Sequence, residues 1–172
     1  MRELFLFRHA KSSWSDLDLD DHDRPLNARG QRAAPMMGQY MQDNAMNPAI
    51  ILCSSSVRTR QTLDLAFPDA HENEMSVVYS RKIYEAPPSA LLQCIATVED
   101  EISSLMLLGH NPGMQMLTLQ LAKTAQGDAL ARIATKFPTA ALARISFQAE
   151  SWRSLSQAGG HLVQFITPKQ LA

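Results

Sequence analysis

The stretch Leu4-Phe5-Leu6-Phe7-Arg8-His9-Ala10-Lys11 decides the fold. Its first four residues are large and apolar, and polar residues bound them, which is typical of a short buried strand. In an open α/β sheet, ligands bind in the crevice outside the carboxyl ends of the strands. Arg8 and His9 stand at such an end and are therefore placed for chemistry. Taken alone, however, this dipeptide more often marks a surface arginine beside an ordinary half-buried histidine.

Two further apolar strands run into polar residues of the same kind. The strand predicted at 49–53 is followed by three serines and by a helix that begins near Arg58 and ends before Pro68. The strand predicted at 104–108 runs into Gly109-His110-Asn111-Pro112, where Asn111 as cap and Pro112 just inside indicate a helix start. Free backbone N–H groups at such strand-to-helix turns suit an anion.

Strand and helix signals alternate from residue 3 to residue 122. Asn27 is the predicted N-cap of a helix over 28–42, which Pro35 should kink or delay. We also expect a strand at 77–79 and helices at 89–98 and 113–122, then a hairpin of strands 140–147 and 161–166. This order predicts an α/β protein: a three-layer α/β/α sandwich with a mostly parallel central sheet and a C-terminal hairpin.

Composition favours one globular domain over residues 1–172. The chain is 45% hydrophobic and 19% charged, and its net charge of −1 excludes a general nucleic-acid binder. No apolar run approaches the roughly 18 residues that span a membrane, and Glu3 and Arg8 come too early for a secretory signal. Cys53 and Cys94 look like reduced thiols. We therefore expect a cytoplasmic protein without nucleic-acid or membrane partners, with a monomer favoured.

The acidic loop at 12–27 does not match a calcium site. With Asp16 as first ligand, an EF-hand needs glycine and glutamate where Asp21 and Asn27 stand. No other His, Cys or Asp cluster has metal-ligand spacing. We expect no metal and no cofactor, and we interpret the loop as solvated.

The three strand ends carry one kind of chemistry. A phosphoryl group needs cations for its oxygens, hydrogen-bond donors and a nucleophile in line. The planar fork of an arginine matches phosphate with two bonds. One histidine, His9 or His110, can attack phosphorus while the other donates to the developing charge. The residues themselves therefore predict phosphoryl chemistry.

The same residues resemble a known family. Arg8-His9 after a first strand, Ser54-Ser55-x-x-Arg58-Thr59-x-Gln61-Thr62, and Gly109-His110 together resemble the histidine phosphatase superfamily, with its phosphoglycerate-mutase-like fold. Arg24-Pro25-Leu26 followed by Gly30, the chain length and the turn after residue 109 look most like the small SixA-type phosphohistidine phosphatases. The resemblance spans residue 1 to about residue 166.

The resemblance implies roles for individual residues. His9 would be the nucleophile that becomes phosphohistidine, and Arg8, Arg58 and His110 would complete the phosphate pocket. Glu85 occupies the place of the acid or base, although a solvated loop carboxylate is an equal alternative. The implied activity is a metal-independent phosphatase that acts on phosphohistidine in a protein.

Other functions stay open at this stage. The pocket would also suit a phosphomonoesterase acting on a small phosphorylated metabolite, or a catalytically silent phosphate-binding module. Cys53 to Arg58 is Cys-x4-Arg, one residue short of the Cys-x5-Arg of cysteine phosphatases and without a glycine. Lys11 and Arg24 are more commonly surface charges than pocket residues, and Arg60 should point away from Arg58. No role is assigned to His22, His71 and His161.

Overall fold

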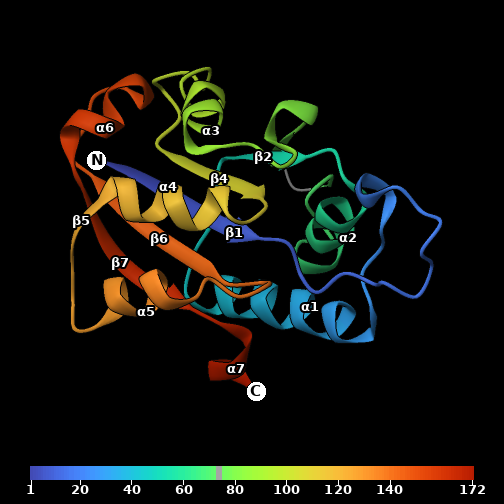
Figure 1. The fold of residues 1–172 in the computed structure, drawn as a ribbon. Helices are drawn as coiled ribbons and strands as arrows, with labels where there is room; N and C mark the ends of the chain where they lie inside the picture. Colours follow the sequence, from blue (N-terminus) through green and yellow to red (C-terminus); the bar gives the residue numbers. More distant parts are fainter. Residues whose placement is uncertain (73–74) are drawn as a thin grey trace.

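A seven-stranded sheet forms the middle layer of the protein (Figure 1). The computed structural model describes residues 1–72 and 75–172. The strand order is β3-β2-β4-β1-β6-β7-β5. The strands are β1 (Arg2–Arg8), β2 (Ile50–Ser54), β3 (Ser76–Ser80), β4 (Ser104–Gly109), β5 (Ala122–Ala125), β6 (Leu142–Phe147) and β7 (Gly160–Ile166).

Helices cover both faces of this sheet. They are α1 (Ala28–Asp43), α2 (Val57–Ala66), α3 (Pro88–Ile95), α4 (Gly113–Leu121), α5 (Ala129–Thr135), α6 (Leu155–Ala158) and α7 (Pro168–Leu171). Three single 3-10 turns are η1 (Asp21–Asp23), η2 (Arg81–Ile83) and η3 (Trp152–Ser154). The predicted three-layer α/β/α sandwich is confirmed.

Alternation along β1 explains the two layers of helices. Leu4 and Leu6 belong to one apolar core, which they share with α3, α4 and α5. Phe5 and Phe7 point to the opposite face and belong to a second core with α1 and α2. All four side chains are fully buried, because a strand in the middle of a sheet has helices on both sides.

Parallel pairing places three strand ends side by side. β4 lies between β1 and β2 and is parallel to both, with Arg8 opposite Gly109 and Cys53 opposite Leu108. The carboxyl ends of β2, β4 and β1 therefore meet at one edge of the sheet. β6 is antiparallel to β1 and to β7, so the predicted C-terminal antiparallel pair is also present.

The first helix forms where the sequence places it. The Asn27 side chain accepts a hydrogen bond from Gly30 N at 2.9 Å, and Pro35 lies inside the helix without delaying its start. A Cβ atom at Gly38 would lie 2.0 Å from the backbone oxygen of Ala66. Glycine is therefore needed where α1 crosses α2 so closely.

The C-terminal third departs from the prediction in detail. β5 and α5 occupy residues that show no clear period, and they were not expected. The link between β6 and β7 is longer than a hairpin loop and includes η3 and α6, where buried Trp152 donates its ring N–H to Ile102 O at 2.8 Å. Within the described residues, no helix has the length and apolar content that crossing a membrane requires.

Candidate active site

The predicted site residues from the three strand ends meet. His9 follows β1, and its backbone N–H donates to the carbonyl of Gly109 at the end of β4, at 3.1 Å. The ring centroids of His9 and His110 are 5.2 Å apart. Arg58, from the first turn of α2, places Nη2 3.3 Å from His110 Nδ1. Parallel register thus joins residues that are up to 102 positions apart in the chain.

His9 is held as one neutral tautomer. Its Nδ1 lies 2.7 Å from the carbonyl oxygen of Ala10, which can only accept a hydrogen bond. Nδ1 therefore carries the proton, and Nε2 keeps a free electron pair. Burial first, and then the positive charges of Arg58 and Arg8, lower the pKa of His9 to about 3. The side chain is consequently neutral, the form in which imidazole is a nucleophile.

His110 is held between Arg58 and Ser54. Its Nδ1 lies 3.3 Å from Arg58 Nη2, and its Nε2 lies 2.7 Å from Ser54 Oγ, a hydroxyl that can donate or accept. Burial, followed by the influence of His9 and Arg58, lowers the pKa of His110 to about 2. Both imidazoles are therefore uncharged, and the positive charge of the site comes from the arginines.

Arg58 is the most connected side chain of the site. It is only 4% exposed, and its Nη2 donates to Asp21 Oδ2 at 2.9 Å and to Glu85 Oε1 at 3.0 Å. Its Nη1 donates to the backbone oxygen of Asp21 at 2.6 Å. Burial opposes ionisation of Asp21, but hydrogen bonds from Tyr84 and Arg58 lower its pKa overall. Both ends of the guanidinium fork are thus fixed.

Arg8 still has a free donor. Its Nη1 donates to the carbonyl of Phe137 at 2.8 Å. Its Nε is buried and finds no hydrogen-bond partner among the residues that the structure describes. Burial lowers the pKa of Arg8, so a bound anion would relieve an incompletely compensated cation.

Glu85 lies in the site. Its Oε1 is 3.6 Å from His110 Nδ1, besides its contact with Arg58, and its side chain is 46% exposed. Its backbone has φ of +52°, a left-handed conformation that costs a non-glycine residue about 1–3 kcal/mol. The neighbouring Tyr84 ring stands edge-on to His110, with centroids 5.3 Å apart. The carboxylate therefore combines solvent access with contact to the phosphate-binding candidates.

The serine-rich motif has a structural explanation. Ser56 caps α2 by accepting from Thr59 N at 3.4 Å. Thr62 Oγ1 accepts from the backbone N–H of Ala10 at 3.0 Å, which fixes the turn after His9. Gln61 Oε1 accepts from Leu26 N at 2.8 Å and holds the preceding loop. The motif thus fixes the start of α2 and the turn that follows β1.

Three residues of this region were missed from the sequence. Asp21, interpreted as part of a solvated loop, binds Arg58, and Tyr84 donates its hydroxyl to the same carboxylate. His22, to which no role was assigned, lies with Nε2 2.9 Å from Ser55 Oγ and its ring 4.9 Å from that of Tyr84. No spacing in the chain connects residues 21, 58 and 84, so only the fold reveals this cluster.

Arg24 is not a surface charge. It is 7% exposed, donates to Asp16 O at 3.1 Å and lies 3.9 Å from the ring centroid of Trp14. Lys11 is exposed, as predicted. The commoner interpretation was therefore wrong for Arg24, which fixes the acidic loop from inside.

The environment of Cys53 does not favour a cysteine phosphatase. The side chain is fully buried, and its thiol donates to the carbonyl of Ser54 at 3.3 Å. Burial raises the pKa of Cys53 to about 12, so the thiolate required for attack is absent at physiological pH. Among the described residues, no group of three His, Cys, Asp or Glu side chains could hold a metal ion.

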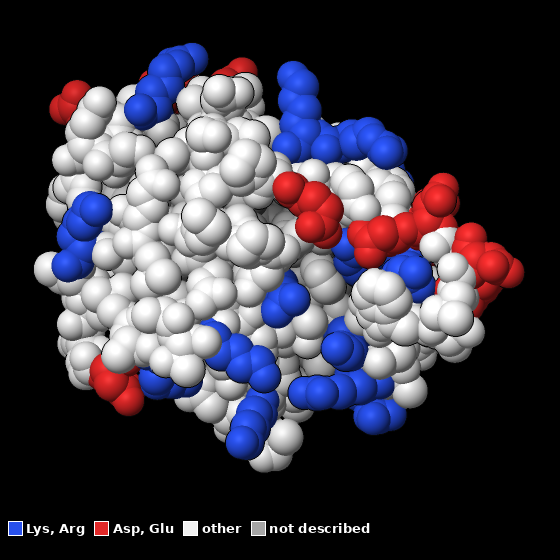
Figure 2. Space-filling model, in the orientation of Figure 1, with Lys and Arg blue, Asp and Glu red and all other residues white. Residues whose placement is uncertain are grey.

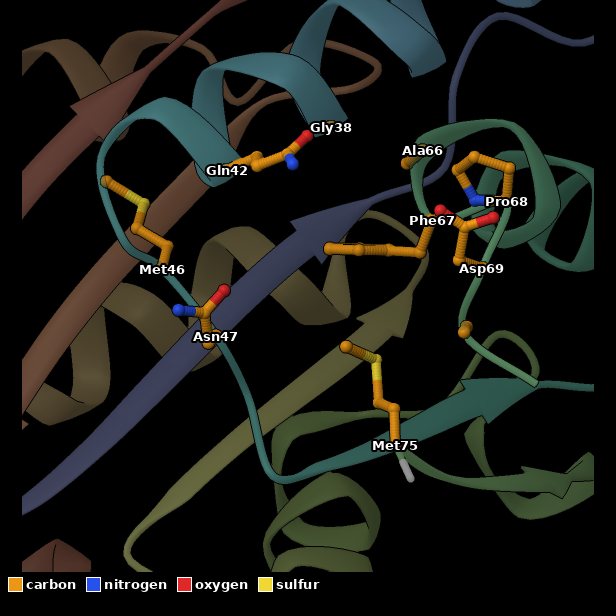
Figure 3. Close-up of a pocket in the computed structure, with 10 residues that line it drawn as sticks. Gly38, Gln42, Met46, Asn47, Ala66, Phe67, Pro68, Asp69 and Met75 are labelled. Carbon is orange, nitrogen blue, oxygen red and sulfur yellow. The ribbon is translucent and has the colours of Figure 1, made fainter. Parts of the chain in front are cut away.

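A hollow in the protein lies away from the histidines. Figure 3 shows a cavity of about 180 Å³ lined by Gly38, Met46, Phe67 and Met75, among others. It lies between the C-terminal parts of α1 and α2, and none of the site residues lines it. Hydrogen bonding and charge, rather than the depth of a cavity, therefore identify the candidate active site.

Comparison with known proteins decides the family. A family model described as histidine phosphatase superfamily (branch 1) matches residues 4–85. The solved structure of an Agrobacterium tumefaciens protein that bears the name phosphohistidine phosphatase SixA is 30% identical, with a TM-score of 0.79, and the match covers 97% of this chain and 98% of that one. The chain belongs to the histidine phosphatase superfamily.

Other relatives of this histidine phosphatase match over nearly their whole length. A structure named as SixA from Nakamurella multipartitia is 27% identical, with a TM-score of 0.84, and covers 97% of this chain and 96% of that one. The uncharacterized protein Rv1276c of Mycobacterium tuberculosis is 35% identical over 164 residues, 94% of this chain and 99% of the relative. Membership in the superfamily supports phosphatase activity.

Proposed function

We propose that this histidine phosphatase hydrolyses a phosphohistidine displayed on a protein, through a covalent intermediate on His9. The observation that carries the proposal is the hydrogen bond from His9 Nδ1 to the Ala10 carbonyl. It leaves Nε2 as the nucleophilic atom of a neutral imidazole, next to two arginines that can receive phosphoryl oxygens.

The first step transfers the phosphoryl group to His9. Its Nε2 electron pair forms a bond to phosphorus while the bond from phosphorus to the substrate's imidazole nitrogen breaks. The leaving imidazole takes the electron pair of that bond and leaves uncharged, because its other ring nitrogen already carries a proton. Positive charge develops on the His9 ring, and the Ala10 carbonyl stabilises it by accepting from Nδ1–H. Arg8 and Arg58 neutralise the phosphoryl oxygens.

The second step releases phosphate. A water molecule attacks phosphorus, the bond from His9 Nε2 breaks, and its electron pair returns to the ring, which becomes neutral again. The attacking water must lose a proton. Glu85 is the candidate to accept it, because its carboxylate is half-exposed and touches both Arg58 and His110.

Two arguments support a phosphohistidine substrate over an alkyl phosphate. An alkoxide leaves poorly without a donated proton, whereas an imidazole can carry its own proton at neutral pH and leave uncharged. The two relatives that bear the SixA name are the second argument, since they match this chain from end to end at 27% and 30% identity.

Glu85→Gln should separate the two kinds of substrate. The amide can still accept from Arg58, but it cannot donate a proton to a leaving alkoxide in the first step, which a leaving imidazole does not need. We expect kcat/KM to fall about 10²–10⁴-fold on an alkyl phosphate and far less on a phosphohistidine protein. The wild type should also prefer the phosphohistidine protein in kcat/KM. Steady-state phosphate release on both substrates measures these values.

The exposed Glu99→Gln, outside the site, is the matched control and should leave both activities unchanged. Equal losses on both substrates in Glu85→Gln would remove the leaving-group argument. A wild-type preference for a small sugar phosphate would overturn the substrate class, and no turnover of any phosphate compound would leave only a binding module.

A further inference from the structure

We propose that the tip of the first loop, residues 13–20, docks the protein that carries the phosphohistidine, and that this partner presents an apolar patch within a basic surface. The inference rests on the proposed function and names the kind of partner that it requires.

Two large apolar side chains stand exposed at this tip. Trp14 is 58% exposed and Leu17 is 79% exposed. Neither belongs to the two apolar cores. Large apolar side chains that stay exposed in polar surroundings are typical of sites of protein interaction. Tryptophan in particular is enriched among the residues that contribute most to binding.

The tip is held in place before any partner arrives. The two ends of the loop are joined by hydrogen bonds. Ser13 N donates to Pro25 O at 2.7 Å, and Ser12 forms an antiparallel bridge with Leu26. The buried Arg24 guanidinium lies 3.9 Å from the centre of the Trp14 ring. A side chain that is already fixed loses less conformational freedom on binding, which favours affinity.

The same loop is attached to the catalytic candidates. Beyond the tip it continues into η1, where Asp21 binds Arg58 and His22 contacts Ser55. Figure 1 shows this loop projecting beyond α2. Arg58 lies in the first turn of that helix. A protein whose phosphohistidine enters the site would therefore meet the tip at the same time.

The charge of the loop selects the partner. Residues 12–27 contain five aspartates and one arginine, a formal charge of −4 in a chain whose total is −1. Asp16, Asp18 and Asp20, close to Trp14 and Leu17 in the sequence, are exposed as well. Figure 2 shows acidic side chains gathered at this end of the molecule. An acidic rim beside a phosphate-binding site favours a partner with basic residues around its phosphohistidine.

The test uses three substrates. Two are versions of one small folded protein with a single surface histidine phosphorylated by phosphoramidate, flanked by lysines in one version and by glutamates in the other. The third is free phosphohistidine. We expect the wild type to prefer the lysine-flanked carrier about tenfold in kcat/KM. Trp14→Ala and Leu17→Ser should each lower kcat/KM on that carrier about 10- to 30-fold, with free phosphohistidine unaffected.

The role of charge is tested with the double variant Asp18→Lys and Asp20→Lys. This variant should have equal kcat/KM on the lysine-flanked and the glutamate-flanked carrier. Matched controls lie elsewhere: Val163→Ser is an exposed apolar position on β7, and Asp69→Lys follows the far end of α2. Both controls should behave like the wild type. Leu17 is so exposed that its replacement leaves the fold intact. Leu17→Ser therefore still tests docking if Trp14→Ala disturbs the packing of Arg24.

The outcomes separate the two proposals. Unchanged carrier turnover in Trp14→Ala and Leu17→Ser would overturn docking by the tip, while the proposed function would stand on wild-type activity. Equal losses on the carrier and on free phosphohistidine would also overturn docking, because the loop would then act through the site. If the wild type cleaves neither carrier nor free phosphohistidine, the proposed function fails and the inference with it.

Discussion

Replacing His9 with alanine should abolish covalent catalysis and lower kcat about 10⁴-fold or more, because no other group would take over the attack on phosphorus. In the wild type, a reaction with ³²P-labelled substrate, quenched under denaturing conditions, should leave label on the protein. That label should be stable in base and labile in acid, as expected for a phosphorus–nitrogen bond. Quenched-flow labelling followed by peptide mapping measures both quantities.

His71→Ala is the matched control for this experiment. His71 is an exposed histidine at the far end of α2, and its replacement should leave both label and turnover unchanged. Acid-labile label that persists in His9→Ala would assign the nucleophile to another residue.

Arg58→Lys should lower kcat/KM by roughly 10²-fold or more, although the charge is kept. The guanidinium serves Asp21 through two nitrogens and contacts Glu85 and His110 as well. A lysine ammonium is a point charge without the planar fork, so it cannot reproduce these contacts and face a phosphoryl group at the same time. Inhibition by vanadate, a phosphate-like anion, should weaken along with turnover.

Arg60→Lys provides a control from the same helix. Arg60 is exposed, two residues along α2, and its side chain reaches Ser55 O and the ring of Tyr79 instead of the site. It should keep normal turnover. Near-normal activity in Arg58→Lys would place Arg58 outside the reaction.

Much of the site could be predicted because it follows from strand order. Apolar runs identify β1, β2 and β4 in the sequence. The carboxyl ends of parallel strands lie at one edge of a sheet, so Arg8, His9 and His110 had to lie close together. Arg58 came with the helix that the three serines begin. The catalytic roles of these residues remain predictions.

The rest depends on contacts that leave no local pattern. Asp21 looks like one of several solvated aspartates until the fold brings it to Arg58, 37 residues away. Arg24 looks like a surface charge, yet the loop folds over it and covers it with Trp14. β5 has only four residues, Ala122–Ala125, and follows a helix directly, so hydrophobic periodicity gives it no signal.

The two neutral imidazoles also set the acid tolerance of the whole protein. In the unfolded chain each histidine titrates near pH 6.5, whereas in the native protein the pKa values of His9 and His110 are about 3 and about 2. Between those values the unfolded chain binds more protons than the native one. The free energy of unfolding is therefore fully retained above about pH 6.5 and declines as the pH falls below it.

Each buried histidine should remove about 1.4 kcal/mol of unfolding free energy per pH unit in that range, a large share of the roughly 5–15 kcal/mol that holds a domain together. Urea unfolding between pH 6 and pH 4.5 measures the slope, which His9→Ala should reduce by about half. An undiminished slope would mean that other groups take up the protons. The arrangement that keeps a nucleophile ready at neutral pH thus makes the same residues the weak point of the fold in acid.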